Sequence, residues 1–271
     1  MRIEVVLNAN ARRGNGSALR ELERALPAAN ILRTTSLEDV EVLAESFVID
    51  PPDLVLSAGG DGSALALVNA VRRARDRVGV RRASLLRLGL LGLGTGNGWA
   101  RSCGAPRLGL GLKRLSSFVE RGGRAIDLPL LRFDLLETEG LLAHFAGTGW
   151  DAELIDDFHG QKTEDGLMPA WMRNGLPGYL NGLLTRAVPR NLRLPRVEVE
   201  VKNTGSAGLG VDARGRPFEL FGEAADRVLY RGPVSVCAVG TSTMWGFGFR
   251  AFPFARLVPG GREGKTALMS E

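Results

Sequence analysis

Cysteine and histidine are scarce in this chain of 271 residues, which contains two of each. Cys103 and Cys237 lie far apart and match neither a zinc-binding nor a redox spacing, so we interpret them as buried free thiols in a reducing compartment. His144 and His159 have no cysteine or carboxylate at a metal-ligand spacing, and we interpret them as ordinary core or surface residues. These absences argue against a disulfide scaffold and against a cysteine- or histidine-based metal site.

Long apolar runs are also missing from the sequence. No stretch approaches the roughly 20 consecutive apolar residues that a membrane-spanning helix needs. The N-terminal residues 1–7 form too short and too charged a segment for a signal peptide. We therefore expect a cytoplasmic protein without a transmembrane segment, which can still bind peripherally at a membrane surface.

Aromatic residues and net charge are both low. Aromatic side chains make up 6% of the chain and no basic motif is interleaved with them, so nucleic acid is not an expected partner. The net charge is only +5, although six arginines gather between residues 72 and 82. One interpretation of this cluster is a solvated helix end, where cations are favourable near the C-terminus. The other is a surface that attracts phosphates or anionic lipid head groups.

Strand-like and helix-like segments alternate over the first 125 residues, and the hydrophobic content of 44% is enough for a proper core. Alternation of this kind predicts an α/β fold with a parallel sheet covered by helices on both faces. Ser36 is the expected N-cap of the second helix, with Asp39 as its capping-box partner. The predicted strands are 2–7, 31–33, 53–56 and 85–91, and the predicted helices are 17–26, 36–47, 64–75 and 108–120.

The pattern changes near residue 125, where we place a domain boundary. The second half predicts a mostly antiparallel β domain, because short apolar runs follow one another with turn-rich links. A helical segment over 169–188 is expected to be interrupted near Pro177 and Gly178. The predicted strands of this half are 124–136, 141–147, 193–201, 217–221 and 233–239.

Three glycine-containing loops follow strand ends in the first half: residues 8–16, 59–63 and 94–97. Ligands of open α/β sheets bind at the carboxyl ends of the strands, so these loops can converge on one ligand. Each loop alone is more often a structural turn, whereas the three together favour a nucleotide site. The hydroxyls of Ser63 and Thr95 can donate to phosphate. The side chains of three asparagines can bond to phosphate or ribose oxygens or else brace the loops: Asn8, Asn10 and Asn97.

Asp61 stands out inside the second loop. Its neighbours Gly59, Gly60 and Gly62 let a ligand approach the main chain, and the helix that follows points its free N–H groups at that ligand. A carboxylate is electrostatically unfavourable beside phosphate unless it holds a metal or takes a proton. The motif therefore suggests phosphate, Mg²⁺ and chemistry at one place.

Two competing glycine motifs fail. The dinucleotide fingerprint should follow the first strand, and the loop after residue 7 does not supply it. The segment Gly264-Lys265-Thr266 has the ending of a phosphate-binding P-loop, but Pro259 stands where that motif needs glycine, and no predicted strand precedes it.

Taken in order, these motifs resemble the diacylglycerol kinase catalytic domain. The resemblance rests on Asn8-x-Asn10, on residues 59–63 and on residues 94–97, and it extends over nearly the whole chain. Residues 147–152 and 238–255 are similar to two further segments of the same family. Bacterial lipid kinases, sphingosine kinases and ceramide kinases share this domain, and NAD kinases are more distant relatives.

The resemblance implies an ATP-dependent lipid kinase that transfers the γ-phosphoryl group of Mg·ATP to a lipid hydroxyl at a membrane surface. It implies a nucleotide-binding α/β domain over residues 1–125 and a β-rich lipid-substrate domain over residues 126–271. Asp61 would bind Mg²⁺ through water or take the proton of the attacking hydroxyl, and is the expected catalytic residue. Asp151 would orient the polar head of the acceptor, unless it is only the N-cap of a helix. The implied nucleotide-binding residues are Asn8, Asn10, Thr34, Gly59, Gly60, Asp61, Gly62, Ser63, Gly94, Thr95, Gly96 and Asn97.

The sequence departs from the family pattern near its end. Pro259 replaces an acidic residue, the chain stops at Glu271 before a late acidic motif, and residues 260–271 lack strand character. These departures leave open an active subfamily, a truncated chain or a catalytically impaired nucleotide-binding relative, and a soluble-substrate kinase of NAD kinase type is a further alternative. A missing strand would expose a sheet edge, which predicts marginal stability or pairing into a homodimer. The acceptor lipid has no simple code in the sequence.

Overall fold

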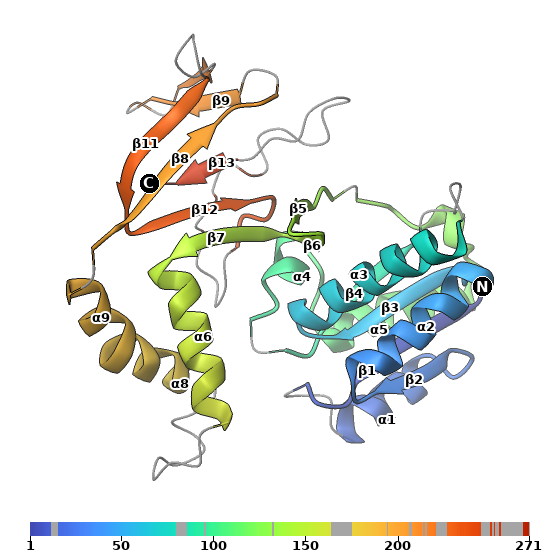
Figure 1. The fold of residues 1–271 in the computed structure, drawn as a ribbon. Coiled ribbons are helices and arrows are strands. Elements are labelled where there is room, and N and C mark those ends of the chain that lie inside the picture. The colour runs from blue at the N-terminus through green and yellow to red at the C-terminus, as the bar shows by residue number, and fades with distance from the viewer. Residues whose placement is uncertain are drawn as a thin grey trace. The chain divides into compact units, whose positions relative to one another are not determined.

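The computed structural model shows a chain divided into two compact units (Figure 1). The first unit comprises residues 1–144 and 244–251, and the second comprises residues 145–243 and 252–271. A functional boundary near residue 125 stays a prediction. The structure describes residues 1–11, 16–79, 86–94, 96–131, 133–163, 175–193, 195–205, 208–212, 214, 216–220, 227–244, 250, 252, 255 and 268–270.

A four-stranded parallel sheet forms the centre of the first unit. Its strands are β1 (Ile3–Asn8), β2 (Asn30–Thr34), β3 (Leu54–Gly59) and β4 (Leu88–Gly92), in the order β2-β1-β3-β4. Asn8 pairs with Thr34, and Gly59 pairs with Gly92, so the carboxyl ends of the strands meet at one edge. The predicted parallel α/β fold is confirmed.

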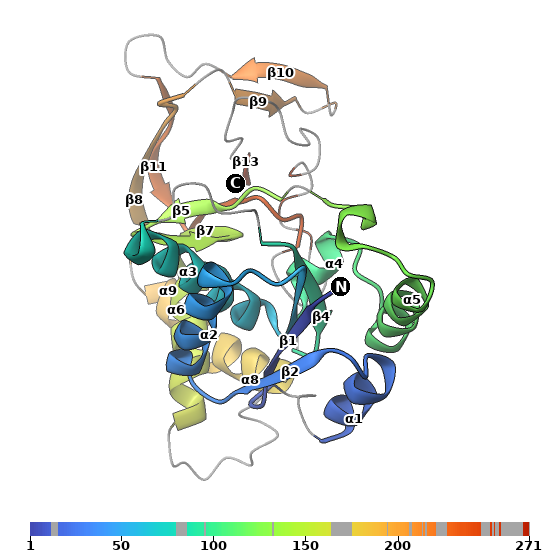
Figure 2. The same cartoon turned by 90° about the vertical axis from the view of Figure 1, so that its right-hand side faces the viewer.

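Helices cover both faces of this sheet (Figure 2). Helices α1 (Gly16–Ala25) and α5 (Leu108–Glu120) pack on one face, and α2 (Leu37–Ile49) and α3 (Asp61–Val78) pack on the other. Successive strand residues point to opposite faces. In β1, Val5 and Leu7 accordingly join the core under α1 and α5, while Val6 joins the core under α2 and α3. The apolar character of both faces of β1 and β3 is what a doubly covered sheet requires.

Two helix starts show how local sequence sets the boundaries. Ser36 caps α2, and Asp39 closes the predicted capping box by accepting hydrogen bonds from the backbone. The hydrogen bonds from Thr35 and Ser36 hold the pKa of the Asp39 carboxyl below its ordinary value. Helix α3 starts at Asp61, three residues before the predicted start, because the extended residue Gly60 already acts as its N-cap. The glycine motif is therefore largely the first turn of a helix rather than a loop.

Asn69 joins α3 to the hairpin of β5 (Leu136–Thr138) and β6 (Leu141–Ala143). Its side-chain amide donates to the carbonyls of Leu65 and Leu142, and its oxygen accepts from the N–H of Leu142 at 2.8 Å. We expect Asn69→Ala to lower the free energy of unfolding by about 1–3 kcal/mol, because it leaves the part-buried N–H and carbonyl of Leu142 in β6 without their partner. Urea unfolding measures this loss.

The matched control for Asn69 is Asn191→Ala. The described side-chain hydrogen bond of Asn191 is local, from its amide to the carbonyl of Ala187 at 3.2 Å. Its removal should change the stability by no more than about 0.5 kcal/mol, as is usual for a surface position. Equal losses in the two variants would contradict the bridging role of Asn69.

The second unit is built mainly of antiparallel strand pairs, as predicted. β12 (Val236–Gly240) pairs on one side with β7 (Phe145–Gly149) and on the other with β13 (Leu268–Ser270). Two further antiparallel pairs are β8 (Val197–Lys202) with β11 (Val228–Val234), and β9 (Gly208–Val211) with β10 (Pro217–Leu220). Gly149, with a φ of 123°, makes the turn from β7 into α6 (Trp150–Thr163).

A continuous helical segment follows, made of α8 (Gly175–Gly182), a π-helical turn η2 (Leu183–Ala187) and α9 (Val188–Arg193). It contains Pro177 and Gly178 without a break, so the predicted interruption there is wrong. Pro177 stands in the first turn of α8, where its missing N–H would have no acceptor within the helix.

None of the helices in the described part of the chain has the length and apolar character that a membrane span requires.

Two other predictions of secondary structure are wrong. The expected strand over 124–136 is replaced by a 3₁₀ turn η1 (Ala125–Asp127), which forms because the Asp127 carboxylate accepts from the backbone and the guanidinium of Arg124. The tail over 260–271 was expected to lack a strand, yet β13 forms there. Pairing with the free edge of β12 supplies its hydrogen bonds, and this partner is not evident from such a short segment.

Candidate functional site

The first predicted loop is tied to the start of α3. The side-chain amide of Asn8, at the end of β1, donates to the hydroxyl of Ser63 at 2.7 Å. The Asn8 oxygen accepts from the backbone N–H of Asn10 at 2.9 Å, and the Asn10 amide donates to the carbonyl of Thr35 at 2.8 Å. These asparagines thus brace the carboxyl ends of β1 and β2 against the first turn of α3.

The second and third loops touch through glycine backbone. The carbonyl of Gly59 accepts from the N–H groups of Leu93 and Gly94, at 2.8 and 3.2 Å. A Cβ atom added to Gly94 would lie 2.5 Å from the Cα of Gly60, closer than real side chains approach. The two loops can therefore contact each other only because residue 94 is glycine and has no side chain.

Asp61 links α3 to the next helix, α4 (Gly98–Ser102). One carboxylate oxygen accepts from the N–H of Gly98 at 2.7 Å, and the other accepts from the N–H of Trp99 at 3.1 Å. A carboxylate at a helix N-terminus satisfies N–H groups that have no partner within the helix, and it also faces the positive end of the helix dipole. A side chain from the first turn of α3 thus caps α4, which begins 37 residues further along the chain.

Asn97 closes the third loop on itself. It stands just before α4 in the left-handed conformation, with a φ of 49°. Its side-chain oxygen accepts from the N–H of Gly94 at 3.0 Å, and its amide donates to the Gly94 carbonyl at 2.8 Å. A Cβ atom built on Gly96 would lie 3.8 Å from the Asp61 carboxylate, so Gly96 also lies next to Asp61. Thr95 lies outside the described residues.

Thr34 ends β2 at the same sheet edge, but its side chain is buried. Its hydroxyl donates to the carbonyl of Leu7 at 3.4 Å. The neighbouring Thr35 is exposed, and its N–H and hydroxyl donate to Asp39 at 2.7 and 3.0 Å. The structure therefore brings together Asn8, Ser63, the glycines and Asp61, while the Thr34 hydroxyl is directed into the sheet.

His144 is a site residue that the sequence analysis treated as ordinary. It is buried at 4% exposure, and its ring stacks on Trp99 of α4 with centroids 5.9 Å apart. Burial lowers the pKa of His144, and the negative charge of Asp61 partly opposes this shift. His144 and Trp99 thus support the residues that Asp61 caps. Only the fold brings residues 61, 99 and 144 together, and no spacing in the sequence signals it.

The lowered pKa of His144 predicts a pH-dependent stability. Because the folded state disfavours protonated His144, the unfolded chain binds that proton more readily once the pH falls below the ordinary pKa of 6.5. Stability should therefore fall with decreasing pH by up to about 1.4 kcal/mol per pH unit until the lowered pKa is reached. Urea unfolding at pH 6.5 and about one unit lower measures this slope.

The variant His144→Gln is the control for this prediction. It has no titrating group at this position, so the part of the slope due to His144 should vanish, while the part due to other groups stays. An unchanged slope in the variant would show that His144 does not carry the effect.

Asp151 belongs to the second unit, where α6 begins at Trp150. It therefore occupies the second position of the helix rather than the N-cap position that was considered for it. Its side chain is outside what the structure describes, and its role at the acceptor stays a prediction.

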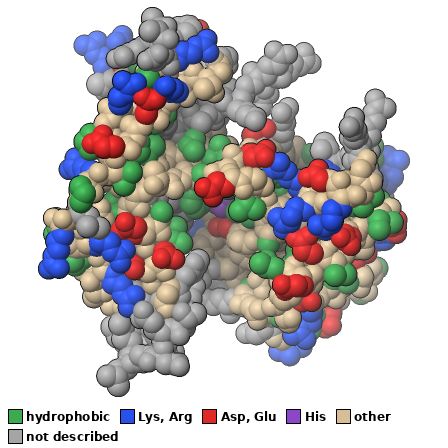
Figure 3. Space-filling model, in the orientation of Figure 1, with side chains coloured by type: hydrophobic (Ala, Val, Ile, Leu, Met, Phe, Trp, Pro, Cys, Tyr) green, Lys and Arg blue, Asp and Glu red, His purple; other side chains and the backbone are tan. Residues whose placement is uncertain are grey.

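The arginine cluster at the end of α3 is largely ion-paired in the described part of the chain (Figure 3). Arg72 pairs with Glu137 at 2.6 Å, Arg73 pairs with Glu41, and Arg77 pairs with Glu45 at 2.8 Å. Figure 3 shows acidic and basic side chains intermixed over α2 and α3. This arrangement fits the interpretation as a solvated helix end. Arg81 and Arg82 lie outside the described residues.

Comparison with known proteins agrees with this geometry. The family model of the diacylglycerol kinase catalytic domain matches residues 2–129, which include all three loops. The match of residues 2–129 to this family model confirms the resemblance inferred from the motifs. No curated protein sequence matches the chain.

Two solved structures of Bacillus anthracis str. Sterne share the fold. Both are described as putative diacylglycerol kinases, and the match with each of them covers 93% of the present chain. One is 16% identical with a TM-score of 0.50 over 67% of its own length, and the other is 18% identical with a TM-score of 0.51 over 68% of its length. At such identities the likeness establishes a common fold and no more.

Proposed function

We propose that this protein is an ATP-dependent lipid kinase, which transfers the γ-phosphoryl group of Mg·ATP to a lipid hydroxyl. The observation that carries the proposal is the position of Asp61. Its carboxylate lies at the carboxyl edge of the parallel sheet, between the N-termini of α3 and α4. The family of residues 2–129 supports the same chemistry.

Backbone N–H groups are the proposed phosphate ligands. Helix α3 begins at Asp61, with Gly60 as an N-cap that contributes no side-chain hydrogen bond. The first N–H groups of a helix have no partner within it, and the helix dipole adds positive potential there, so this turn suits phosphate. Among the described residues, no heavy atom outside the chain neighbours and backbone of the same helix lies within 4 Å of a Cβ atom built on Gly62, which leaves room for a ligand.

Asp61 is the proposed catalytic residue. Its two oxygens accept one N–H each, and an ionised carboxylate has about four lone-pair positions, so it can still accept from a lipid hydroxyl or from metal-bound water. Within the described residues no three metal-ligating side chains gather. Mg²⁺ in kinases needs only one or two carboxylates besides the phosphates, so Asp61 fits it. When bound, Mg²⁺ neutralises charge on the transferring phosphoryl group.

A second candidate function is nucleotide binding without catalysis. The observation that favours it is the same pair of hydrogen bonds, because they give Asp61 a structural purpose as the cap of α4. In that case Asp61 would hold the loops in place, and the protein would bind ATP without transferring its phosphoryl group.

Release of ADP distinguishes these functions. The chain is incubated with Mg·ATP alone, with mixed micelles that contain diacylglycerol, a sphingoid base or a ceramide, and with NAD. The proposal expects ADP release that depends on one of the lipids and not on NAD. Release with NAD alone would identify a soluble-substrate kinase, and ATP binding without release under any condition would identify the non-catalytic alternative.

A further inference from the structure

The helical segment Gly175–Arg193 of the second unit has its apolar side facing outward. Four large apolar side chains follow one another at every fourth position, and their exposures are 45%, 67%, 42% and 83%. These residues are, in order, Leu180, Leu184, Val188 and Leu192, and we call them the outer stripe. Single exposed leucines are common on protein surfaces, whereas a continuous apolar row indicates a binding surface.

The inner side of the same segment is made of small residues. Gly178, Gly182 and Ala187 are buried, and α8 and η2 pack against α6. Small side chains let the helices come close without using the leucines. The four residues of the outer stripe therefore do not belong to the core of the second unit, which is unlike the apolar stripe of an ordinary amphipathic surface helix.

The π-helical turn keeps the outer stripe in line. In an α-helix of 3.6 residues per turn, a residue four positions on lies about 40° further around the axis, so a row at every fourth position drifts. The π-helix makes i→i+5 hydrogen bonds and winds more loosely. Because η2 lies in the middle of the segment, it takes up part of this drift between Leu184 and Val188.

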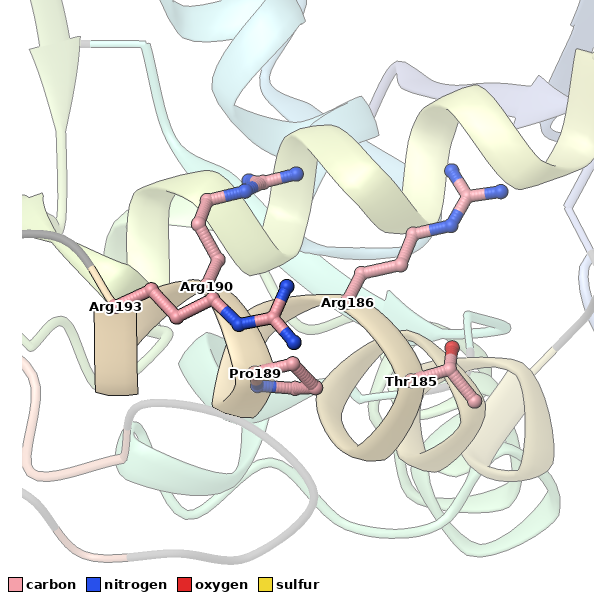
Figure 4. A pocket seen from close by; sticks show the side chains of 5 residues that line it. All are labelled: Thr185, Arg186, Pro189, Arg190 and Arg193. Carbon is pink, nitrogen blue, oxygen red and sulfur yellow. The ribbon is translucent and has the colours of Figure 1, made fainter.

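The charge of the segment is entirely positive. Residues 175–197 contain four arginines and neither aspartate nor glutamate. Arg190 is neutralised by Glu153 and Asp157 of α6, at 3.3 and 3.1 Å, while Arg193 and Arg196 are exposed. In the close-up of the pocket lined by Thr185, Arg186, Pro189, Arg190 and Arg193, the side chains of Arg186 and Arg190 extend towards α6 and that of Arg193 lies over Pro189 (Figure 4).

We propose that the outer stripe and its arginines bind the surface of an anionic lipid membrane. A helix with leucines on one side and arginines at its margin lies in the interface of a bilayer, where its apolar side chains enter the boundary between head groups and acyl chains. The arginines then face the negative head groups, which attract basic segments near the surface. This membrane binding rests on the proposed function, because a lipid kinase must reach an acceptor that lies in a membrane.

Vesicle co-sedimentation without ATP tests this proposal. The probes are vesicles of phosphatidylcholine alone and of phosphatidylcholine mixed with phosphatidylglycerol. We expect the chain to bind the anionic vesicles and not the neutral ones, and to lose binding as salt screens the arginines. The double variant Leu184→Gln, Leu192→Gln should lower the partition coefficient at least about tenfold, because two large apolar side chains no longer enter the bilayer.

The matched control replaces two equally exposed apolar residues of α2, Val42 and Ile49, with exposures of 68% and 72%. The double variant Val42→Gln, Ile49→Gln should bind like the original chain. A second charge variant, Arg193→Gln with Arg196→Gln, should lower binding to anionic vesicles, while replacement of the ion-paired Arg72 and Arg73 should not. Except for Arg72, which is half-buried, the variants change exposed side chains, and circular dichroism checks that all of them are folded.

Several results would overturn the proposal. These are equal binding by the stripe variant and its α2 control, absence of binding to anionic vesicles, or equal binding to neutral ones. If the stripe variant instead turned a dimer into a monomer without changing vesicle binding, the occupant would be a second copy of the chain. The variant Asp61→Asn is expected to bind vesicles normally, so failure of the kinase proposal and failure of the membrane proposal give different results.

Discussion

Replacing Asp61 with asparagine is expected to reduce phosphoryl transfer from ATP to lipid by at least about 100-fold, as loss of a general base or of an electrostatic stabiliser does in other enzymes. The physical reason is that asparagine has no negative charge with which to take a proton or to hold metal-bound water. The measurement is initial-rate transfer of label from γ-labelled ATP at saturating lipid.

The same substitution should also lower stability. The N–H groups of Gly98 and Trp99 bond to different oxygens of Asp61, at 2.7 and 3.1 Å. In asparagine one of these oxygens is replaced by an NH2 group, which donates and cannot accept, so one N–H loses its acceptor. Leaving one N–H at the start of α4 without a partner costs about 1–3 kcal/mol. Thermal melting followed by circular dichroism measures this cost independently of activity.

Asp127→Asn is the matched control for Asp61→Asn. Asp127 also accepts from backbone N–H, at the 3₁₀ turn η1, and lies away from the three loops in sequence. Its replacement should leave transfer within about twofold, within the ordinary effect of a surface substitution. If Asp61→Asn kept nearly full transfer, Asp61 would be only the cap of α4.

Gly94→Ala is expected to separate the second and third loops. The new methyl group would lie 2.5 Å from the Cα of Gly60, which is a backbone atom and cannot rotate away. Overpacking of this kind costs about 1–3 kcal/mol. For a protein of this size that corresponds to a fall in melting temperature of about 2–4 °C per kcal/mol. Affinity for ATP should fall as well, because the proposed phosphate site needs both loops in place.

The companion variant Gly62→Ala separates folding from nucleotide binding. A Cβ atom on Gly62 meets no side chain within 4 Å in the described part of the protein, and alanine is the better helix former, so the melting temperature should stay equal or rise. The added methyl group enters the space proposed for phosphate, so ATP affinity should still fall. Equal melting temperatures for Gly94→Ala and the original chain would contradict the close contact between the loops.

Much of the first unit could be predicted because its signals are local. The capping box of Ser36 and Asp39 lies within four residues, and α2 begins where it predicts. Helix α5 covers the predicted residues 108–120, since its apolar spacing is regular. The parallel sheet follows from the alternation of strands and helices, and the meeting of the three loops follows from the rule for strand ends.

The remaining features depend on contacts between distant residues. The Asp61 carboxylate caps α4, whose first residues are 37 and 38 positions further on, and His144 lies beside both only in the folded chain. Likewise, β13 forms because β12 offers it a free edge. The sequence showed that Asp61 is special, but its hydrogen-bond partners and its buried histidine neighbour required the structure.

The most direct test of the account is transfer of label from γ-labelled ATP, with Mg²⁺, to a panel of lipids in mixed micelles by the original chain, Asp61→Asn and Asp127→Asn. The account predicts a labelled lipid with the original chain and with Asp127→Asn, and its loss with Asp61→Asn. Labelled lipid of equal intensity from all three proteins, or none from original protein that still binds ATP, would contradict it.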